Sequence, residues 1–445
     1  KIIINLAPAE LPKDGSHFDL PIALSILCIS GTLNQGDIND AVFAGELALD
    51  GSLRPIRSAI ITAEVAKNQK IKSVYVPAQN AKQAALVTGI DVFPVENLKS
   101  LFLHLKKEKI IKPIDRSSIK NTSLNHKSAP TIDDIYGQEQ AKRAIQIAVA
   151  GRHNILLSGP PGSGKTMLAK SLKNLLPALS EDEIVEVTKL HSLGEHTIIN
   201  NTVVDRPFRS PHHTASRASI IGGGSKVQPG EISLAHRGVL FLDELLEYPR
   251  TVLESLRQPL EDHEITVSRA NGKFNFPANF LLVATMNPCP CGFLGDPEKT
   301  CICSQNQILN YQKRLSGPLL DRIDLTVSVS RVPHEKLLNN KMSTKSQQET
   351  FLSEIHKAYS VQRDRYKCSY KYNNDIPSSN VDKITSISES AKTFLMDAAK
   401  KLDLSTRSYF KVIKVSRTIA DLEGSTSIEI PHIAESLQYR QINIG

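Results

Sequence analysis

The chain has 445 residues, of which 40% are hydrophobic and 22% charged, a balance typical of a globular protein with two or three domains. No apolar stretch approaches the length of a transmembrane helix, which excludes a membrane-spanning class and favours the cytoplasm. The net charge of +8 and the pI of about 9.0 favour an anionic partner such as nucleic acid, although charge alone is weak support.

The first predicted domain, residues 1–110, mixes strand-like and helical patterns. It begins in apolar residues typical of the middle of a strand, so we expect its start to be missing. Residues 5–23 and 45–56 resemble the Lon-protease-like domain. In that alignment Asp19 stands where an active domain needs a nucleophilic Ser, and Ile60 where it needs a Lys base. The resemblance therefore implies a catalytically inert domain that serves assembly or substrate contact.

Composition divides the rest of the chain into three parts. Residues 111–130, rich in Ser, Asn and Lys, are typical of a linker. Residues 131–335 alternate strands with helices, the pattern of a parallel sheet with crossover helices. Residues 336–445 begin in a polar stretch and continue as helices. The six cysteines of the chain suit a reducing compartment with a metal site better than disulfides.

The most informative motif follows the apolar run 155–157. A strand, a glycine-rich loop and a helix beginning near Lys165 form a complete phosphate-binding loop. The glycines let backbone N–H groups cradle phosphates, and the helix N-terminus adds its positive dipole end. We expect Lys165 to reach the β- and γ-phosphates and Thr166 to ligate Mg²⁺. The predicted nucleotide-binding residues are Gly159, Pro160, Pro161, Gly162, Ser163, Gly164, Lys165 and Thr166.

Two inserted segments carry basic side chains. The first lies at 206–236 and contains Pro-His-His-Thr and Gly-Gly-Gly; the second is a predicted hairpin at 264–273 with a tight Asn-Gly turn. Cations on these segments could neutralise the phosphates of a threaded strand. A solvated charged face or a contact between subunits is the alternative for each of them. The candidate DNA-binding residues are Arg206, Arg209, Lys226, Arg269 and Lys273.

Two further apolar strands end in polar side chains suited to hydrolysis. Asp243 and Glu244 follow the strand 239–242, where Asp243 can hold Mg²⁺ through water and Glu244 can orient or deprotonate the attacking water. Asn287 follows the strand 280–286 and can hydrogen-bond the γ-phosphate or that water. With the phosphate loop, these residues predict ATP hydrolysis rather than binding alone.

Four cysteines cluster in the loop after Asn287. Four thiolates can form a tetrahedral Zn²⁺ site that staples an exposed loop. Cys-x-Cys pairs are less diagnostic than Cys-x-x-Cys pairs, so four reduced thiols remain the alternative. A catalytic role is not expected, because no open ligand position or acid–base partner is evident. The candidate ligands are Cys289, Cys291, Cys301 and Cys303.

The three strand-end motifs resemble Walker A, Walker B and sensor 1 of the AAA+ ATPases. The resemblance implies that Gly137 and Gln138 belong to the adenine-side segment. It also implies that Arg322 is an arginine finger entering the neighbouring subunit's site and that Arg407 is sensor 2, clamping the phosphates from the lid. A surface ion pair is the alternative for Arg322, and Arg417 is a rival for Arg407. A finger acting in trans implies a ring, most often a hexamer in these ATPases.

The two inserted segments resemble the helix-2 insert and pre-sensor-1 hairpin of the magnesium-chelatase and MCM group. With the Lon-like domain, the Asn-Pro-Cys-Pro-Cys-Gly segment and the helical lid, the layout is similar to the ComM/YifB family. The resemblance implies an α/β fold: an AAA+ P-loop parallel sheet with a helix-2 insert and a helical lid, preceded by a degenerate Lon-like α+β domain.

The same resemblance implies a function. It is that of a hexameric motor that uses ATP and Mg²⁺ and promotes branch migration of recombination intermediates during natural transformation. The implied partners are single-stranded or branched DNA and recombination proteins. One alternative is the motor subunit of a magnesium-chelatase-like complex. Another is a non-catalytic DNA clamp that uses nucleotide only to assemble.

Overall fold

The computed structural model describes residues 2–6, 15–115, 129–194, 202–224, 227–269, 272–332, 346–367 and 372–440. The chain divides into two compact units. The first comprises Lys1–Leu124 with Ala178–Asp205, and the second comprises Asn125–Pro177 with Arg206–Gly445. The stretch 178–205 thus belongs to the first unit, whereas the sequence assigned it to the ATPase core.

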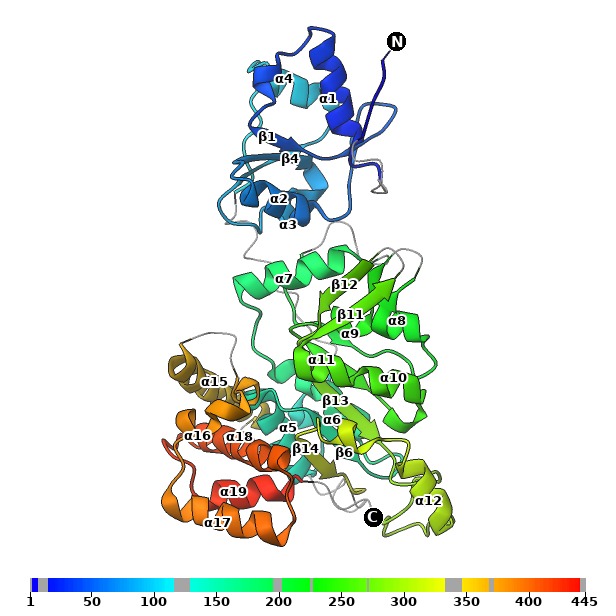
Figure 1. Ribbon diagram of the computed structural model, residues 1–445, viewed down its shortest axis with the longest axis vertical. Coiled ribbons are helices and arrows are strands. Elements are labelled where there is room, and N and C mark those ends of the chain that lie inside the picture. Colours follow the sequence, from blue (N-terminus) through cyan, green and yellow to red (C-terminus); the bar gives the residue numbers. More distant parts are fainter. Residues whose placement is uncertain are drawn as a thin grey trace. The chain divides into compact units, whose positions relative to one another are not determined.

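The first unit is built on a three-stranded parallel sheet in the order β1-β4-β5, with helices on both faces (Figure 1). Val74 and Val76 share one core with α2 and α3, while Tyr75, on the opposite face of β4, shares another with α1 and α4. This alternation follows from the two-residue period of a strand. The bounds are α1 (Asp19–Ile29), β1 (Ala41–Phe43), β2 (Glu46–Leu47), β3 (Leu53–Arg54), α2 (Ala59–Asn68), β4 (Ser73–Pro77), α3 (Ala81–Ala84), β5 (Asp91–Val95) and α4 (Leu98–Leu105).

Helix α7 (Glu181–Ser192) joins this unit through α2. A capping box between Ser180 and Glu183 begins the helix. Val185 then packs against the core that α2 lines, and Lys189 forms an ion pair with Glu64 at 2.6 Å. These contacts are distant in sequence, so composition and motifs did not reveal them.

The positions aligned with a Lon-type Ser–Lys pair have structural roles. Ile60 is fully buried in the core of the first unit. Asp19 begins α1 and accepts a hydrogen bond from the backbone N–H of Leu47 at 3.3 Å. The Lon-like character of the unit stays a prediction.

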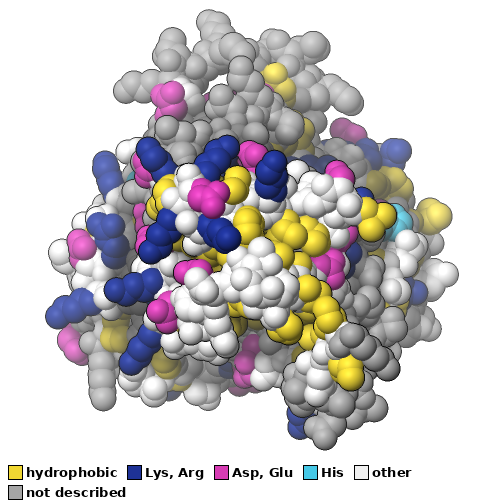
Figure 2. Space-filling view, turned by 90° about the horizontal axis from the view of Figure 1, so that it is seen from above, with side chains coloured by type: hydrophobic (Ala, Val, Ile, Leu, Met, Phe, Trp, Pro, Cys, Tyr) yellow, Lys and Arg dark blue, Asp and Glu magenta, His cyan; other side chains and the backbone are white. Residues whose placement is uncertain are grey.

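Several exposed lysines lie on helix α4 of the first unit and in the turn after it. Lys99, Lys106, Lys107 and Lys109, on α4 and in the turn after it, are all exposed. The view in Figure 2 shows Lys and Arg side chains gathered beside a group of hydrophobic side chains. Asp and Glu side chains lie among them in the same view, so the surface carries charges of both signs.

The second unit contains a five-stranded parallel sheet in the order β14-β6-β13-β10-β7. Strands β6, β13 and β10 are almost entirely buried, as expected for a parallel sheet covered on both faces. Because all pairs are parallel, the carboxyl ends of the strands meet at one edge. The bounds are β6 (Ile155–Ser158), β7 (Phe208–Arg209), β10 (Val239–Leu242), β13 (Leu281–Met286) and β14 (Leu325–Ser328).

One face of this sheet packs on helices from the core and the lid. Side chains of β6, β13 and β14 share a core with helices α5, α6, α15 and α18 (Figure 1). The lid is therefore docked on the core within this unit. The bounds are α5 (Glu139–Gly151), α6 (Lys165–Ser171), α15 (Gln347–Tyr366), α16 (Val381–Ile384), α17 (Glu389–Lys401), α18 (Thr406–Leu422) and α19 (Ile430–Gln438).

Both inserted segments form structure in this unit. Strands β11 and β12 pair antiparallel as the predicted hairpin, from Glu264↔Pro277 to Arg269↔Gly272. Among the described helices, none combines the length and apolar character that crossing a membrane requires. The remaining bounds are α8 (Arg217–Ile221), β8 (Gly222–Gly223), β9 (Gln228–Pro229), α9 (Glu231–Leu234), α10 (Arg250–Ser255), α11 (Arg257–Asp262), β11 (Glu264–Arg269), β12 (Gly272–Pro277), α12 (Gln305–Gln312) and α13 (Gly317–Leu320).

Candidate functional site

The phosphate loop lies between the end of β6 and the start of α6. Gly162 and Gly164 have φ of +78° and +87°, in the left-handed region that favours glycine. A Cβ on Gly159 would lie 2.1 Å from the carbonyl oxygen of Val329, so no larger residue fits there without moving the backbone. The local conformation thus accounts for the glycines of the motif.

The Lys165 amine is held inside this loop. Its Nζ donates to the carbonyl oxygens of Gly159 at 2.6 Å and Pro160 at 2.8 Å, and to Oδ1 of Asn287 at 3.3 Å. Burial lowers the pKa of Lys165, and the nearby carboxylates of Asp243 and Glu244 oppose that shift. Lys165 and Asn287 therefore meet at the same edge of the sheet, where phosphate oxygens can replace the acceptors.

A possible Mg²⁺ site lies beside the amine. The Thr166 hydroxyl donates to Oδ2 of Asp243 at 3.1 Å. The Thr285 hydroxyl donates to the other oxygen of Asp243 and accepts the backbone N–H of Glu244 at 3.1 Å. Oxygen ligands of this kind suit Mg²⁺. Sequence reasoning missed Thr285, whose signal is a polar residue inside an otherwise apolar strand.

Glu244 projects from the end of β10 with a left-handed backbone, φ 53°. Its side chain is 56% exposed, which leaves the carboxylate accessible to water, and its Oε2 lies 3.8 Å from Nδ1 of His213. The Tyr248 hydroxyl donates to the carbonyl oxygen of Pro211 at 2.6 Å, and burial together with Asp243 and Glu244 raises the Tyr248 pKa. The first inserted segment thus contacts the predicted catalytic carboxylate, which sequence reasoning did not foresee.

Gly137 and Gln138 lie near this edge, before α5. Both have left-handed φ, 61° and 60°. The Gln138 amide donates to the carbonyl oxygen of Ser330, beyond the end of β14, and a Cβ on Gly137 would contact Val332. Their assignment to an adenine-side segment stays a prediction.

Arg322 and Arg407 lie together at the opposite end of the sheet. Both pair with Glu261, Arg407 at 3.4 Å. The Arg322 carbonyl accepts from the side chain of Asn154, the residue before β6, whereas the phosphate loop follows β6. With Asn154 they line a polar pocket of about 350 Å³. The packing of α18 holds Arg407 at the end of the sheet away from the phosphate loop of its own chain, and its role as sensor 2 stays a prediction.

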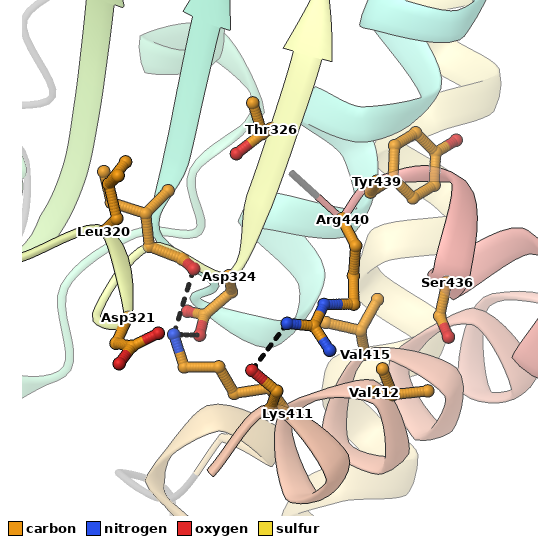
Figure 3. Close-up of a pocket in the computed structure, with 12 residues that line it drawn as sticks. Leu320, Asp321, Asp324, Thr326, Lys411, Val412, Val415, Ser436, Tyr439 and Arg440 are labelled. Carbon is orange, nitrogen blue, oxygen red and sulfur yellow. Dashed lines mark hydrogen bonds and ion pairs between the residues drawn. The ribbon is translucent and has the colours of Figure 1, made fainter. Parts of the chain in front are cut away.

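An ion-pair cluster connects the Arg322 segment with the lid (Figure 3). Nζ of Lys411 in α18 lies 3.0 Å from Oδ1 of Asp324 and donates to the carbonyl oxygen of Ile323 at 2.9 Å. Arg440 donates to the Ser408 hydroxyl at 2.5 Å. Asp324 and Lys411 are both largely buried, so this contact fixes the segment that carries Arg322.

The rival candidate Arg417 is a packing residue. Its side chain is 1% exposed and pairs with Asp421 at 3.0 Å. It also donates to the carbonyl oxygens of Ser425 and Thr426. A phosphate has no access to this guanidinium.

The candidate DNA-binding residues differ in their surroundings. Arg206 is 9% exposed and donates to the carbonyl oxygens of Pro177 and Arg237, and this burial argues against the predicted DNA contact. Arg209 forms a bidentate pair with Glu231 at 2.6 Å, which neutralises its charge. Lys273 is exposed on β12. Lys226 and the side chain of Arg269 lie outside the described residues.

The four cysteines converge. Their sulfur atoms lie within 4.8 Å of one another, and three of the separations are 3.4, 3.5 and 3.6 Å. A tetrahedral Zn²⁺ with bonds of about 2.3 Å places its sulfurs about 3.8 Å apart. A backbone hydrogen bond from Phe293 is the main cause of a Cys291 pKa lowered to about 6, whereas the pKa of Cys289 is raised, mainly by burial, and those of Cys301 and Cys303 are also raised. The sulfurs therefore fit a closed four-thiolate metal site.

The nucleotide loop, the two strand-end carboxylates and the sheet order define a P-loop ATPase of the AAA+ type. Residues 131–337 match the family "Magnesium chelatase, subunit ChlI", residues 1–80 match "Subunit ChlI of Mg-chelatase", and residues 345–440 match "Magnesium chelatase, subunit ChlI C-terminal". The chain belongs to the ComM/YifB family of magnesium-chelatase-like AAA+ proteins.

Three relatives illustrate this membership. Competence protein ComM of Haemophilus influenzae is 42% identical over 443 residues, which is 99% of this chain and 85% of that protein. Uncharacterized protein YifB of Escherichia coli is 38% identical over 444 residues, 100% of this chain and 85% of that protein. The magnesium-chelatase 38 kDa subunit of Cereibacter sphaeroides is 27% identical over 171 residues, 35% of this chain and 51% of that protein.

Proposed function

We propose that the chain is one subunit of an ATP-hydrolysing ring motor that acts on DNA. The observation that supports this is the placement of two half-sites at opposite ends of one sheet. The phosphate loop follows the last residue of β6. The Arg322–Arg407 pair lies beside Asn154, the residue before the first one of β6. The two half-sites are therefore separated by the length of this four-residue strand, about 13 Å. A head-to-tail contact would bring the arginines of one chain to the phosphates of the next, and such contacts close into rings. The family resemblance implies a hexamer.

The chemistry follows from the described side chains. Loop N–H groups and Lys165 bind the phosphates of ATP, and Thr166 and Asp243 hold Mg²⁺. Glu244 takes a proton from the attacking water, and Asn287 positions that water or the γ-phosphate. Arg322 of the neighbouring subunit neutralises the charge that develops in the transition state. In the isolated chain Glu261 pairs with Arg322 and Arg407. In the proposed ring, the γ-phosphate of the ATP bound to the neighbouring subunit would replace Glu261 as their partner.

DNA is the proposed substrate of the motor. Support comes from the net charge of +8, the exposed Lys273 on the hairpin and the competence protein among the relatives. We infer that the ring binds single-stranded or branched DNA and promotes branch migration of recombination intermediates in the cytoplasm during natural transformation, together with recombination proteins. A magnesium-chelatase motor subunit is the second candidate, supported by the three family matches.

A mixing experiment tests the ring. Lys165→Ala removes the nucleotide side of the site, and Arg322→Ala removes the arginine side. Each variant alone should lose ATPase activity. An equal mixture should regain about a quarter of wild-type activity. In a mixed ring, about one subunit interface in four joins an intact Lys165 of one subunit to an intact Arg322 of the next. A mixture that stays as inactive as its components would reject action in trans.

A DNA-stimulated ATPase assay tests the substrate. Forked DNA should raise the turnover of the wild type. Glu244→Gln should bind ATP but lose turnover by about a hundredfold or more, the contribution of a general base. Glu247→Gln, which removes a carboxylate three residues away, is the matched control. Turnover indifferent to DNA would favour the chelatase reading, and turnover retained in Glu244→Gln would reject its role as base.

We further propose that the four cysteines bind one structural Zn²⁺. The support is the convergence of four sulfurs at separations close to those of a tetrahedral site. Metal analysis of protein purified under reducing conditions should find one zinc per chain. The Cys291→Ser/Cys301→Ser variant should contain none.

A further inference from the structure

The cysteine loop packs directly on the phosphate loop. Gly292, between the two cysteine pairs, has φ +84°, and a Cβ there would lie 2.6 Å from Cδ of Pro161. Its N–H donates to the carbonyl oxygen of Cys289 at 2.9 Å, which closes a tight turn beside a cysteine. The backbone of the metal-binding loop is therefore one wall of the loop that binds phosphate.

Arg331 links the same two loops. Its Nη2 donates to the carbonyl oxygen of Pro161 at 3.1 Å, and its Nε lies 3.3 Å from Oδ2 of Asp296. Its Nη1 lies 3.4 Å from Glu298, and its guanidinium lies 5.5 Å from the ring centre of Phe293. Asp296 is fully buried, and only 22% of the Arg331 side chain is exposed. This guanidinium spans the phosphate loop and the cysteine loop at a fixed distance.

Three of the four residues that Arg331 contacts lie inside the stretch that the metal would close. Phe293, Asp296 and Glu298 all fall between Cys291 and Cys301. A metal bound to the cysteines joins the ends of that stretch and removes most of its conformational freedom. Without the metal, only its own contacts order the segment between Cys291 and Cys301. The packing of Gly292 against Pro161 would then be less rigid.

We propose that metal occupancy of the four-cysteine site controls the nucleotide affinity of the phosphate loop, with Arg331 as the positioning residue that transmits it. The inference rests on the zinc site proposed above. Fixing the Pro161 carbonyl orients the loop whose N–H groups bind phosphate. The effect therefore falls on ATP binding more than on the chemical step, so KM should change more than kcat.

The test measures the Kd of a fluorescent ATP analogue with the full chain. Zinc is removed by a zinc-selective chelator under reducing conditions and restored with zinc chloride. Removal should weaken binding about tenfold, the size expected for losing one charge-assisted hydrogen bond, and zinc should restore it. Arg331→Ala should keep its zinc, bind the analogue about tenfold more weakly and no longer respond to removal. Lys313→Ala, which removes an exposed cation just after α12, outside this cluster, should behave as the wild type.

The outcomes separate the two proposals. A chain that neither contains nor takes up zinc would overturn the metal site. A chain that binds zinc but holds the analogue equally well with and without it would overturn the coupling and leave the site standing. An Arg331→Ala variant that responds to zinc as the wild type does would reject Arg331 as the link. Measuring its unfolding midpoint alongside keeps a folding defect from imitating the expected loss.

Discussion

Acidification should weaken the docking of the lid on the core through one buried histidine. His153 follows α5 and is fully buried, with Nε2 2.7 Å from the Thr418 hydroxyl of α18. Its Nδ1 lies 3.9 Å from Asp324. Burial lowers the pKa of His153 from 6.5 to about 4; Asp324 opposes that shift, and Lys414 and Lys411 add to it. The folded protein therefore holds the imidazole neutral at pH values where the unfolded chain protonates it.

The size of the effect follows from linkage. Well above pH 6.5 the imidazole is neutral in both states, so His153 adds no pH dependence to the free energy of unfolding. As the pH falls from 6.5 to 4, only the unfolded state gains the proton, so the free energy of unfolding decreases. The loss is about 2 kcal/mol at pH 5 and approaches about 3 kcal/mol below pH 4, since each unit of pKa difference corresponds to about 1.4 kcal/mol.

Hydrogen exchange measured by mass spectrometry can detect this loss in α18. The opening free energy of peptides from 406–422 is compared between pH 7.5 and pH 5 in the wild type and in His153→Gln, whose amide can still meet Thr418 but does not titrate. The wild type should lose about 2 kcal/mol more than the variant over this interval. Because only the pH-dependent difference is compared, a constant destabilisation by the substitution cancels. Equal pH dependence in both proteins would refute the assignment.

Three further changes probe the site. Thr285→Val removes a hydroxyl that donates a hydrogen bond to Asp243, the proposed Mg²⁺ ligand. Steady-state ATPase assays should show a kcat lowered about tenfold, and binding assays should show that ATP still binds. Gly159→Ala places a Cβ against a backbone carbonyl and should abolish nucleotide binding by calorimetry; normal affinity would contradict the described loop. Lys273→Ala should weaken DNA binding and reduce the salt slope of log K by about 1, whereas Lys392→Ala on the lid should leave both unchanged.

The parts of the site that the sequence could predict are those set by local pattern. Asp243 and Asn287 each follow an apolar run typical of a buried strand, and Lys165 follows such a run and a glycine-rich loop. Parallel strands bring such positions to one edge, so their meeting follows from the motifs and the topology. The predicted parallel sheet is present in the structure, and the family matches cover the same stretch.

The parts that the sequence could not predict depend on contacts between distant residues. The guanidinium groups of Arg206 and Arg417 are buried against backbone carbonyls. The Arg322 side chain is 13% exposed; it pairs with Glu261 and donates to the carbonyl oxygen of Pro318 at 2.6 Å. Arg407 lies beside Glu261 because α18 packs on the core, a contact between residues 146 positions apart (407 − 261). A basic residue in a motif thus indicates charge, whereas burial and partners decide whether the charge is available.

The two arginines at Glu261 and the ion pair at Asp324 together suggest how subunits would communicate. Arg407 belongs to the lid helix, and Arg322 to the segment that Lys411 of the same helix holds through Asp324. A shift of α18 would therefore move both arginines together rather than one alone. The lid also packs on β6, the strand that leads into the phosphate loop, through the core shared with α5 and α18. In the proposed ring, the same helix would touch both half-sites of one subunit: the strand that leads into the phosphate loop and the segment that carries the arginine pair.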